Sequence, residues 1–427
     1  MHLPRMLPIR LNLPNLPAIQ IDGAIEEAFA GLRSLLPVGG RVAIGVGSRG
    51  ISNIDRIVRG VVDQVLAAGA TPFIVPAMGS HGGAVATGQQ QILADYGITE
   101  ESMGVMIDSS MDVRQVGATD DGVPVYCALS ALQADGILLV NRIKPHTDFV
   151  GTLGSGLLKM CVIGLGKRKG AAAMHLAATQ YGYERVIRAM AGVVIRNSPV
   201  LGGIGILENI DHQTAKLVGV RRDEMEIAEN QLLEEARRLL PVLPFRVVDL
   251  LIIDWMGKNI SGSGMDPNVI FRSVHGYSSL LAVPEGTATH IHRIFVRDLT
   301  PQSHGNAVGI GLADLTTNRL IEKTDRRITN INSLTSLTPQ SAKLPIAVES
   351  DREAIECLLK MLPVENYHQA RVVRIRSTLD LAEMLISESL LDGGIGPSGW
   401  TVLGPAEEIQ FDSNGNLTGS RLDEPTA

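Results

Sequence analysis

The stretch Arg41-Val-Ala-Ile-Gly-Val-Gly-Ser-Arg-Gly50 predicts the fold of the N-terminal half. A short apolar run enters a glycine-rich turn, and apolar residues then recur at helical spacing from Ile54 to Val65. Pro72-Phe-Ile-Val-Pro76 and Gly136-Ile-Leu-Leu-Val-Asn141 are further buried strands by the same reasoning. Buried strands that alternate with helices indicate a doubly wound, mostly parallel, Rossmann-like sheet.

A chain of 427 residues predicts two α/β domains with a cleft between them. The first domain spans residues 1–240 and ends in an acidic amphipathic helix, which stops at the hinge Pro241-Val-Leu-Pro244. A second, smaller α/β domain covers residues 245–395. Its strands are expected near 247–254, 291–296 and 372–375, and its helices near 306–323, 341–361 and 377–390.

Composition limits the class of partner and the compartment. A net charge of −7, with only the short basic cluster Lys167-Arg168-Lys169, argues against a nucleic-acid partner. Three separated cysteines without a CxxC pair indicate a reducing compartment. The N-terminus lacks a signal-peptide pattern, and no apolar run reaches the roughly 18–20 residues that span a bilayer. We therefore expect a cytoplasmic protein without a membrane partner.

The turn Gly45-Val-Gly-Ser-Arg-Gly50 matches the G-x-G-x-x-G dinucleotide fingerprint. That fingerprint also expects an acidic residue roughly 20 positions later, at the end of the second strand. The second strand here runs into Gly79-Ser-His-Gly-Gly83 and carries no Asp or Glu. The glycines are equally well explained by a tight strand-to-helix turn. An NAD(P)-dependent oxidoreductase therefore stays open as an alternative.

Arg49, His81 and His146 each lie just beyond a predicted strand. Ligands of doubly wound sheets bind at the carboxyl ends of the strands, so the three residues could share one site. An imidazole can take and give a proton at neutral pH, which makes His81 a candidate general acid or base. The alternative for a histidine between glycines is a plain surface residue.

Lys159 and His175 are the next candidates. Lys159 follows a glycine-rich segment and is flanked by apolar residues, so it is either a snorkelling side chain or a nucleophilic amine suited to a covalent adduct. His175 lies in an Ala-rich helix and could be a core histidine or a metal ligand. A zinc site of three histidines is a further alternative, without an H-E-x-x-H pattern to support it. In the second domain, Lys258 and Arg272 lie in a loop and could bind a substrate carboxylate or solvate a turn.

This set of residues resembles the nickel-pincer-nucleotide-dependent lactate racemase family over nearly the whole chain. The resemblance also implies that the C-terminal segment 398–427 packs back on the first domain. The matching residues stand in the family's order and near its spacings: Arg49, His81 after Gly-Ser, His146 after Pro, Lys159 and His175.

The resemblance implies a covalently bound cofactor, the nickel-pincer nucleotide (pyridinium-3-thioamide-5-thiocarboxylic acid mononucleotide with nickel). Lys159 would form its thioamide link and His175 would bind the nickel. His81 and His146 would be the acid/base pair, and Arg49 would hold the substrate. Further cofactor contacts are implied for small residues whose backbone amides could reach the phosphate: Gly79, Ser80, Gly82, Gly154, Ser155 and Gly156.

The implied activity is the racemisation or epimerisation of a 2-hydroxy acid by hydride transfer from C2, with proteins of cofactor synthesis as partners for loading. Several departures concern the substrate side. Arg49 lacks the acidic residue and the proline of the family pattern, and Gly82 replaces an arginine. The segment from His146 to Lys159 is a few residues longer. We therefore expect a substrate other than lactate, with Lys258 or Arg272 at a longer or second carboxylate.

Three other classes of function remain open at this stage. They are an NAD(P)-dependent oxidoreductase of 2-hydroxy or 2-keto acids, a non-catalytic nickel- or nucleotide-binding protein, and a hydrolytic zinc enzyme.

Overall fold

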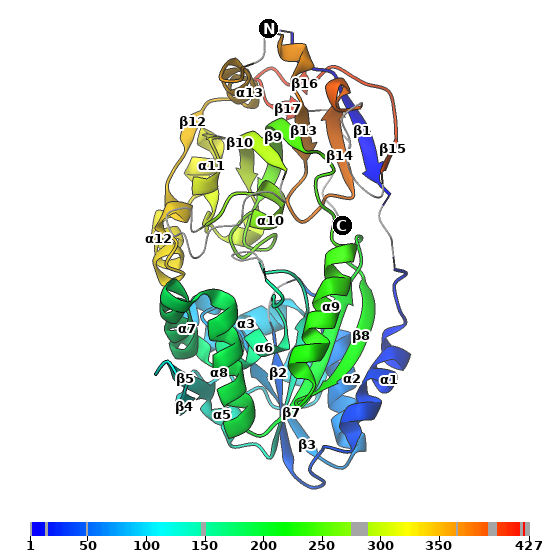
Figure 1. Cartoon of the computed structure of the whole chain (residues 1–427), viewed down its shortest axis with the longest axis vertical. Helices are drawn as coiled ribbons and strands as arrows, with labels where there is room; N and C mark the ends of the chain where they lie inside the picture. The colour runs from blue at the N-terminus through cyan, green and yellow to red at the C-terminus, as the bar shows by residue number, and fades with distance from the viewer. Residues whose placement is uncertain are drawn as a thin grey trace. The chain divides into compact units, whose positions relative to one another are not determined.

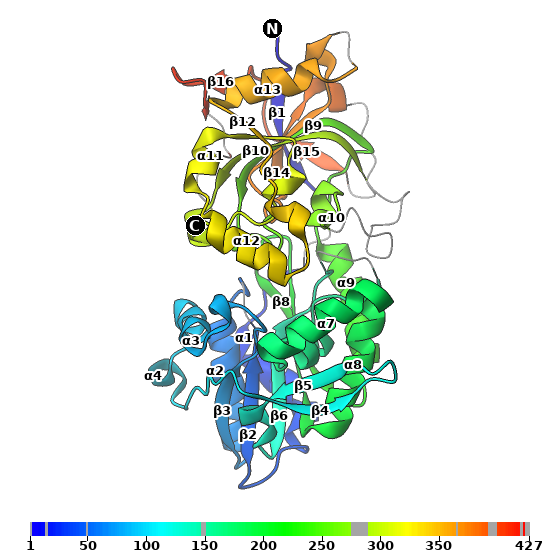
Figure 2. The same ribbon diagram turned by 90° about the vertical axis from the view of Figure 1, so that its left-hand side faces the viewer.

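The computed structural model describes residues 2–12, 16–47, 50–146, 151–274, 289–363, 366–391, 399–418 and 422. The chain divides into two compact units. The N-terminal unit comprises Asn15–His146 and Val150–Leu240, and the C-terminal unit comprises Met1–Pro14, Thr147–Phe149 and Pro241–Ala427. Each unit contains its own sheet (Figures 1 and 2).

The sheet of the N-terminal unit has five strands in the order β3-β2-β6-β7-β8. Neighbours among the first four strands are parallel, and β8 runs antiparallel to β7. This confirms the mostly parallel sheet that the sequence predicts. The strands are β2 (Arg41–Val46), β3 (Thr71–Pro76), β6 (Gly136–Arg142), β7 (Val200–Glu208) and β8 (Thr214–Arg221).

Helices cover both faces of this sheet. Successive side chains of a strand point to opposite faces, so each strand contacts helices on both sides. Ile204 and Ile206 of β7 join the core formed with α1 (Ile21–Arg33) and α2 (Ile54–Ala67). Gly203 and Gly205, which alternate with these isoleucines, lie against Leu157 of α6 and Leu232 of α9 on the other face. The remaining elements are α3 (Ala86–Asp95), α4 (Glu100–Met103), β4 (Val113–Ala118), β5 (Pro124–Ala128), α5 (Leu129–Leu132), α6 (Leu157–Lys159), a π-helical turn (Met160–Gly164), α7 (Lys167–Tyr181), α8 (Tyr183–Asn197) and α9 (Met225–Leu239).

The sheet of the C-terminal unit has eight strands in the order β12-β11-β10-β9-β13-β14-β1-β15. The first five are mutually parallel, and β14, β1 and β15 add an antiparallel edge. The strands are β1 (Met6–Leu11), β9 (Val247–Met256), β10 (His290–Leu299), β11 (Leu315–Thr317), β12 (Ile346–Val348), β13 (Val372–Ile375), β14 (Glu383–Ser387) and β15 (Trp400–Val402). The other elements are α10 (Pro267–Ile270), α11 (Asn318–Lys323), α12 (Arg326–Thr335), α13 (Asp351–Lys360), β16 (Gln410–Phe411) and β17 (Leu417–Thr418).

The structure differs from the expected arrangement at both ends of the chain. The N-terminal strand β1 belongs to the sheet of the C-terminal unit, where Leu7, Ile9 and Leu11 enter its core. The segment 398–427 was expected on the first domain, but β15 pairs with β1 and so stays in the C-terminal unit. The helix expected near 377–390 is also wrong, because β14 occupies Glu383–Ser387. Among the helices of the described ranges, none has the length and apolar composition needed to cross a bilayer.

Candidate functional site

Two of the predicted site residues, His81 and His146, follow strands that end at the same edge of the N-terminal sheet. Strands β3 and β6 both pair in parallel with β2, so the carboxyl ends of all three strands lie at the same edge. His81 follows β3 and His146 follows β6. These two strands flank β2, so their ends are two strand spacings apart, about 10 Å. Arg49 follows β2 but lies outside the described residues.

The loop after β6 brings Lys159 to His146. Lys144 and Ser155 exchange two backbone hydrogen bonds, at 2.9 and 2.8 Å, which fold the loop back on itself. Lys159 Nζ then lies 2.7 Å from Nε2 of the buried His146 and 3.3 Å from Ser155 Oγ. A protonated amine only donates hydrogen bonds, so this contact selects the His146 tautomer that carries its proton on Nδ1.

Tyr183 connects His146 with His175, a role that the sequence analysis missed. Its ring stacks on His146, with 5.8 Å between the centroids and 29° between the planes. The same ring meets His175 edge to face at 6.0 Å, and its hydroxyl lies 3.4 Å from His175 Nδ1. Lys159, His146, Tyr183 and His175 thus form one continuous series of contacts. The available signal was a tyrosine directly after Gly182 in a chain with 4% aromatic residues.

A buried carboxyl supports the turn that carries Lys159. Glu229 Oε2 accepts a hydrogen bond of 2.9 Å from Leu158 N, and a Cβ on Gly156 would lie 2.4 Å from Glu229 Cδ. Burial raises the pKa of Glu229 to about 7, against the opposing effects of the Leu158 and Leu157 amides and of the Arg188 and Lys159 charges. The sequence analysis missed Glu229 too. Its signal is an acidic residue on the apolar face of α9, beside Met225, Leu232 and Leu233.

The turn that carries His81 is held by backbone contacts and one side chain. Gly79 O and His81 O accept hydrogen bonds from Gln89 Nε2, at 2.9 and 3.4 Å. Gly82 has a φ of +62° and packs so closely on Gly88 that a Cβ would lie 2.4 Å from its carbonyl carbon. Gly154 is equally close to Lys144 O. Internal packing therefore requires these glycines already, and their contact with a phosphate stays a prediction.

Lys258 and Arg272 lie in the C-terminal unit, and both make local contacts. Lys258 Nζ donates to Gly262 O within its own turn. The Arg272 guanidinium pairs with Asp314 Oδ2 at 2.6 Å and donates to Leu312 O at 2.7 Å. A substrate carboxylate at Arg272 would therefore compete with Asp314.

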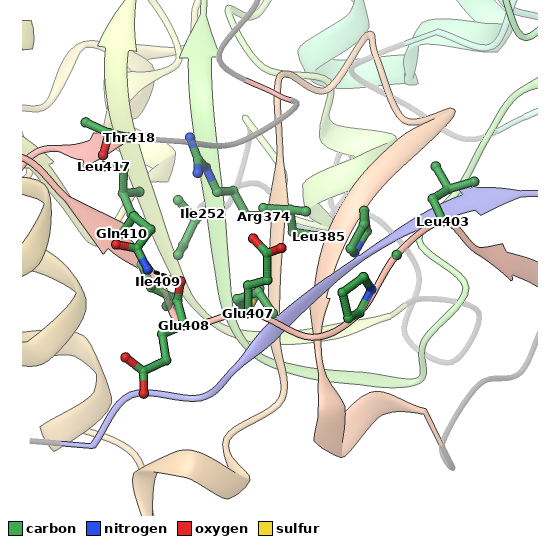
Figure 3. Close-up of a pocket in the computed structure, with 14 residues that line it drawn as sticks. Ile252, Arg374, Leu385, Leu403, Glu407, Glu408, Ile409, Gln410, Leu417 and Thr418 are labelled. Carbon is green, nitrogen blue, oxygen red and sulfur yellow. Dashed lines mark hydrogen bonds between the residues drawn. The ribbon is translucent and has the colours of Figure 1, made fainter.

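The C-terminal unit also contains a pocket of about 360 Å³ beside β1, β14 and the 403–410 segment (Figure 3). Its lining includes Arg374, Glu407 and Thr418, and none of the candidate site residues. Within the described ranges, no three His, Cys, Asp or Glu side chains gather in an arrangement that could hold a metal ion.

Two comparisons with known proteins bear on this chain. The family model described as the lactate racemase N-terminal domain matches residues 21–185. Among solved structures, the chain resembles the lactate racemase apoprotein from Thermoanaerobacterium thermosaccharolyticum, with a TM-score of 0.52 and 12% identity over 88% of this chain and 99% of that chain. No curated protein sequence matches significantly. The structural likeness bears on the fold alone, and the sequence match shows that residues 21–185 are similar to the lactate racemase N-terminal domain.

Proposed function

We propose that the protein is a racemase or epimerase of a 2-hydroxy acid that carries a nickel-pincer nucleotide on Lys159. The observation that supports this most directly is the series of contacts from Lys159 through His146 and Tyr183 to His175. It combines an amine that can form a covalent link with an imidazole that can bind nickel. The donor set therefore fits the cofactor that the family resemblance implies.

Each residue would hold the cofactor through a distinct atom. Lys159 Nζ would form the thioamide, and His175 would donate Nε2 to the nickel. A metal-binding histidine usually donates its second ring N–H to an acceptor, which fixes its tautomer. The Tyr183 hydroxyl, 3.4 Å from His175 Nδ1, is such an acceptor. When bound, the cofactor would supply an acceptor for the hydride from substrate C2.

His146 and His81 would move the protons. Loss of a hydride from C2 requires the hydroxyl proton to leave, and an imidazole with a pKa near 6.5 can take it. Reduction from the opposite face then needs a second imidazole that returns a proton. In the unloaded chain Lys159 Nζ lies 2.7 Å from His146 Nε2. Conversion of the amine to a thioamide would remove its charge and leave a single N–H, so its hold on Nε2 would weaken.

The substrate would be a 2-hydroxy acid whose carboxylate is held by Arg49. A substrate longer than lactate is proposed because the family's acidic residue and proline are absent beside Arg49 and a glycine follows His81. Lys258 and Arg272 would supply a second cationic contact, with Arg272 exchanging its Asp314 partner for a substrate carboxylate.

The test is intact mass spectrometry of protein co-produced with the cofactor-synthesis proteins, followed by a screen of 2-hydroxy acids by chiral chromatography. We expect a mononucleotide-sized adduct with nickel in the wild type and in Lys169→Ala, an exposed lysine ten residues away, and none in Lys159→Ala. An unmodified wild-type chain, under conditions that load a known family member, would overturn the proposal. NAD(P)H consumption with a 2-keto acid would then favour the oxidoreductase.

A further inference from the structure

Lys167 is a fully buried lysine that the proposed chemistry does not use. It begins α7, has no exposed surface, and directs Nζ to Pro76 O at 2.6 Å and to Gln89 Oε1 at 3.2 Å. Desolvation lowers the pKa of the amine to about 8, although the nearby Asp108 and Cys127 oppose the shift. The amine is thus still mostly protonated at neutral pH and donates charge-assisted hydrogen bonds to the end of β3.

Gln89 passes this restraint to the turn that carries His81. Its side chain is also fully buried, and its Oε1 is the acceptor for Lys167. An ammonium cannot accept a hydrogen bond, so the amide must present Nε2 to the other side. There Nε2 donates to Gly79 O and His81 O. Lys167, Gln89 and the backbone of the turn therefore form one buried network.

Two features of Lys167 lower the stability of the folded chain. Its φ of +51° lies in the left-handed region, which costs a non-glycine residue about 1 kcal/mol or more. A protonated amine is also removed from water, and burial of charge is a poor source of stability compared with apolar packing. A methionine could fill the same volume without the charge. Costs of this kind concentrate where the backbone must be held in one arrangement for function.

The turn itself needs an external restraint. Gly79, Gly82 and Gly83 all have positive φ values, and glycine has the most backbone freedom of any residue. The direction of the His81 ring depends on the backbone that carries it. Gln89 supplies such a restraint, because its Nε2 donates to two carbonyl groups of the turn.

We propose that Lys167 and Gln89 are positioning residues, which form a buried clamp that fixes the Gly79–His81 turn and so sets the direction of His81. The clamp acts through the backbone and does not touch the substrate. Its consequence for turnover rests on the proposed acid/base role of His81, whereas its effect on the turn does not.

The first measurement concerns the turn alone, in the unloaded chain. Gln89→Met removes both donated hydrogen bonds and keeps the side-chain volume. Gln91→Met is the matched control, because Gln91 lies on the same helix, is exposed, and donates to Asp95 of its own helix. We expect amide hydrogen exchange over residues 79–85 to be at least about tenfold faster in Gln89→Met, and unchanged in Gln91→Met. Equal exchange in all three proteins would overturn the clamp.

The second measurement uses the loaded enzyme and separates positioning from folding. In Gln89→Met we expect the Lys159 adduct to form as in the wild type, kcat to fall at least about tenfold with a smaller change in KM, and the pH limb that depends on His81 to move. An unchanged kcat and pH profile, with faster exchange, would overturn the catalytic part. If the wild type neither loads nor racemises, the proposed function fails, and the exchange experiment still decides whether the clamp holds the turn.

Discussion

Two lysines eight residues apart meet opposite surroundings. Lys159 ends α6, is partly exposed, and contacts the side chains of His146 and Ser155. Lys167 begins α7, is fully buried, and contacts the backbone of Pro76 and the buried amide of Gln89. The π-helical turn Met160–Gly164 lies between them and Lys167 has a positive φ, and the two side chains contact different elements.

The difference indicates which of the two amines can be modified without a large loss of stability. The partners of Lys159 are side chains, the buried His146 and the partly exposed Ser155, and a side chain can rotate when the amine is modified. The partners of Lys167 are a strand carbonyl and a buried amide, which have no alternative donor once the amine is lost. A reactive lysine and a structural lysine can therefore be distinguished by the kind of atom that holds them, and not by sequence context, since both follow glycine-rich segments.

The sharpest test of this contrast is the same substitution at both positions. Lys167→Met leaves Pro76 O and Gln89 Oε1 buried without a donor, and each such acceptor costs about 1–3 kcal/mol. We expect the free energy of unfolding of the unloaded chain to fall by about 3 kcal/mol in Lys167→Met and by less than about 1 kcal/mol in Lys159→Met. Urea denaturation measures both. Equal losses would contradict the distinction.

The support beneath Lys159 gives the next largest effect. A Cβ on Gly156 would lie within 2.4–2.7 Å of three atoms of the Glu229 carboxyl group, and both residues are buried. Gly156→Ala should therefore lower the free energy of unfolding by about 2 kcal/mol and displace Lys159 from His146. Gly31→Ala is the control, because Gly31 is helical and has open space around its Cα. It should be neutral or stabilise by about 0.5–1 kcal/mol. Similar losses in both variants would refute the packing argument.

The sequence predicted the elements of this site better than their long-range partners. Buried strands such as Gly136–Asn141 were recognised because they are continuous apolar runs, and the strand-end histidines follow from topology. The pairing of β1 with β14 and β15 was not predicted, because no local sequence pattern links residues 6–11 to the far end of the chain. Residues near 383–387 were taken for a helix although tertiary pairing makes them a strand.

The missed site residues share a physical reason. Tyr183, Glu229 and Gln89 act through contacts with residues distant in sequence, which no local pattern encodes. In the basic cluster 167–169, the last two residues are exposed as expected of a charged run, and Lys167 alone turns inward. A lysine in a charged run is normally expected at the surface. Lys167 is buried because Pro76 O and Gln89 Oε1 are there to accept its hydrogen bonds.

The buried carboxyl of Glu229, which supports the turn of Lys159, makes the free energy of unfolding depend on pH. Its pKa is raised by burial from the ordinary value to about 7, so the folded state binds a proton more tightly than the unfolded state does. Stability from this group is therefore lost as pH rises through the interval between 4.5 and 7. We expect the wild type to lose about 2 kcal/mol more than Glu229→Gln between pH 5 and pH 8, as measured by denaturation at both pH values. Parallel pH profiles would exclude an ionising Glu229. Lys167, whose pKa is lowered, contributes the opposite slope between pH 8 and 10.5.

Tyr183→Phe has the smallest expected effect on stability and reports on function most directly. The substitution keeps the ring that stacks on His146 and removes the hydroxyl 3.4 Å from His175 Nδ1. The free energy of unfolding should change by less than about 1 kcal/mol, because one long hydrogen bond is lost. The tautomer populations of His175 in the unloaded chain, measured by nitrogen-15 NMR, should shift away from the form protonated at Nδ1. Tyr183→Leu also removes the stacked ring and should in addition disturb the NMR signals of His146. If Tyr183→Phe left the His175 tautomers unchanged, the hydroxyl would not orient the imidazole, and Tyr183 would be a packing residue between the two histidines.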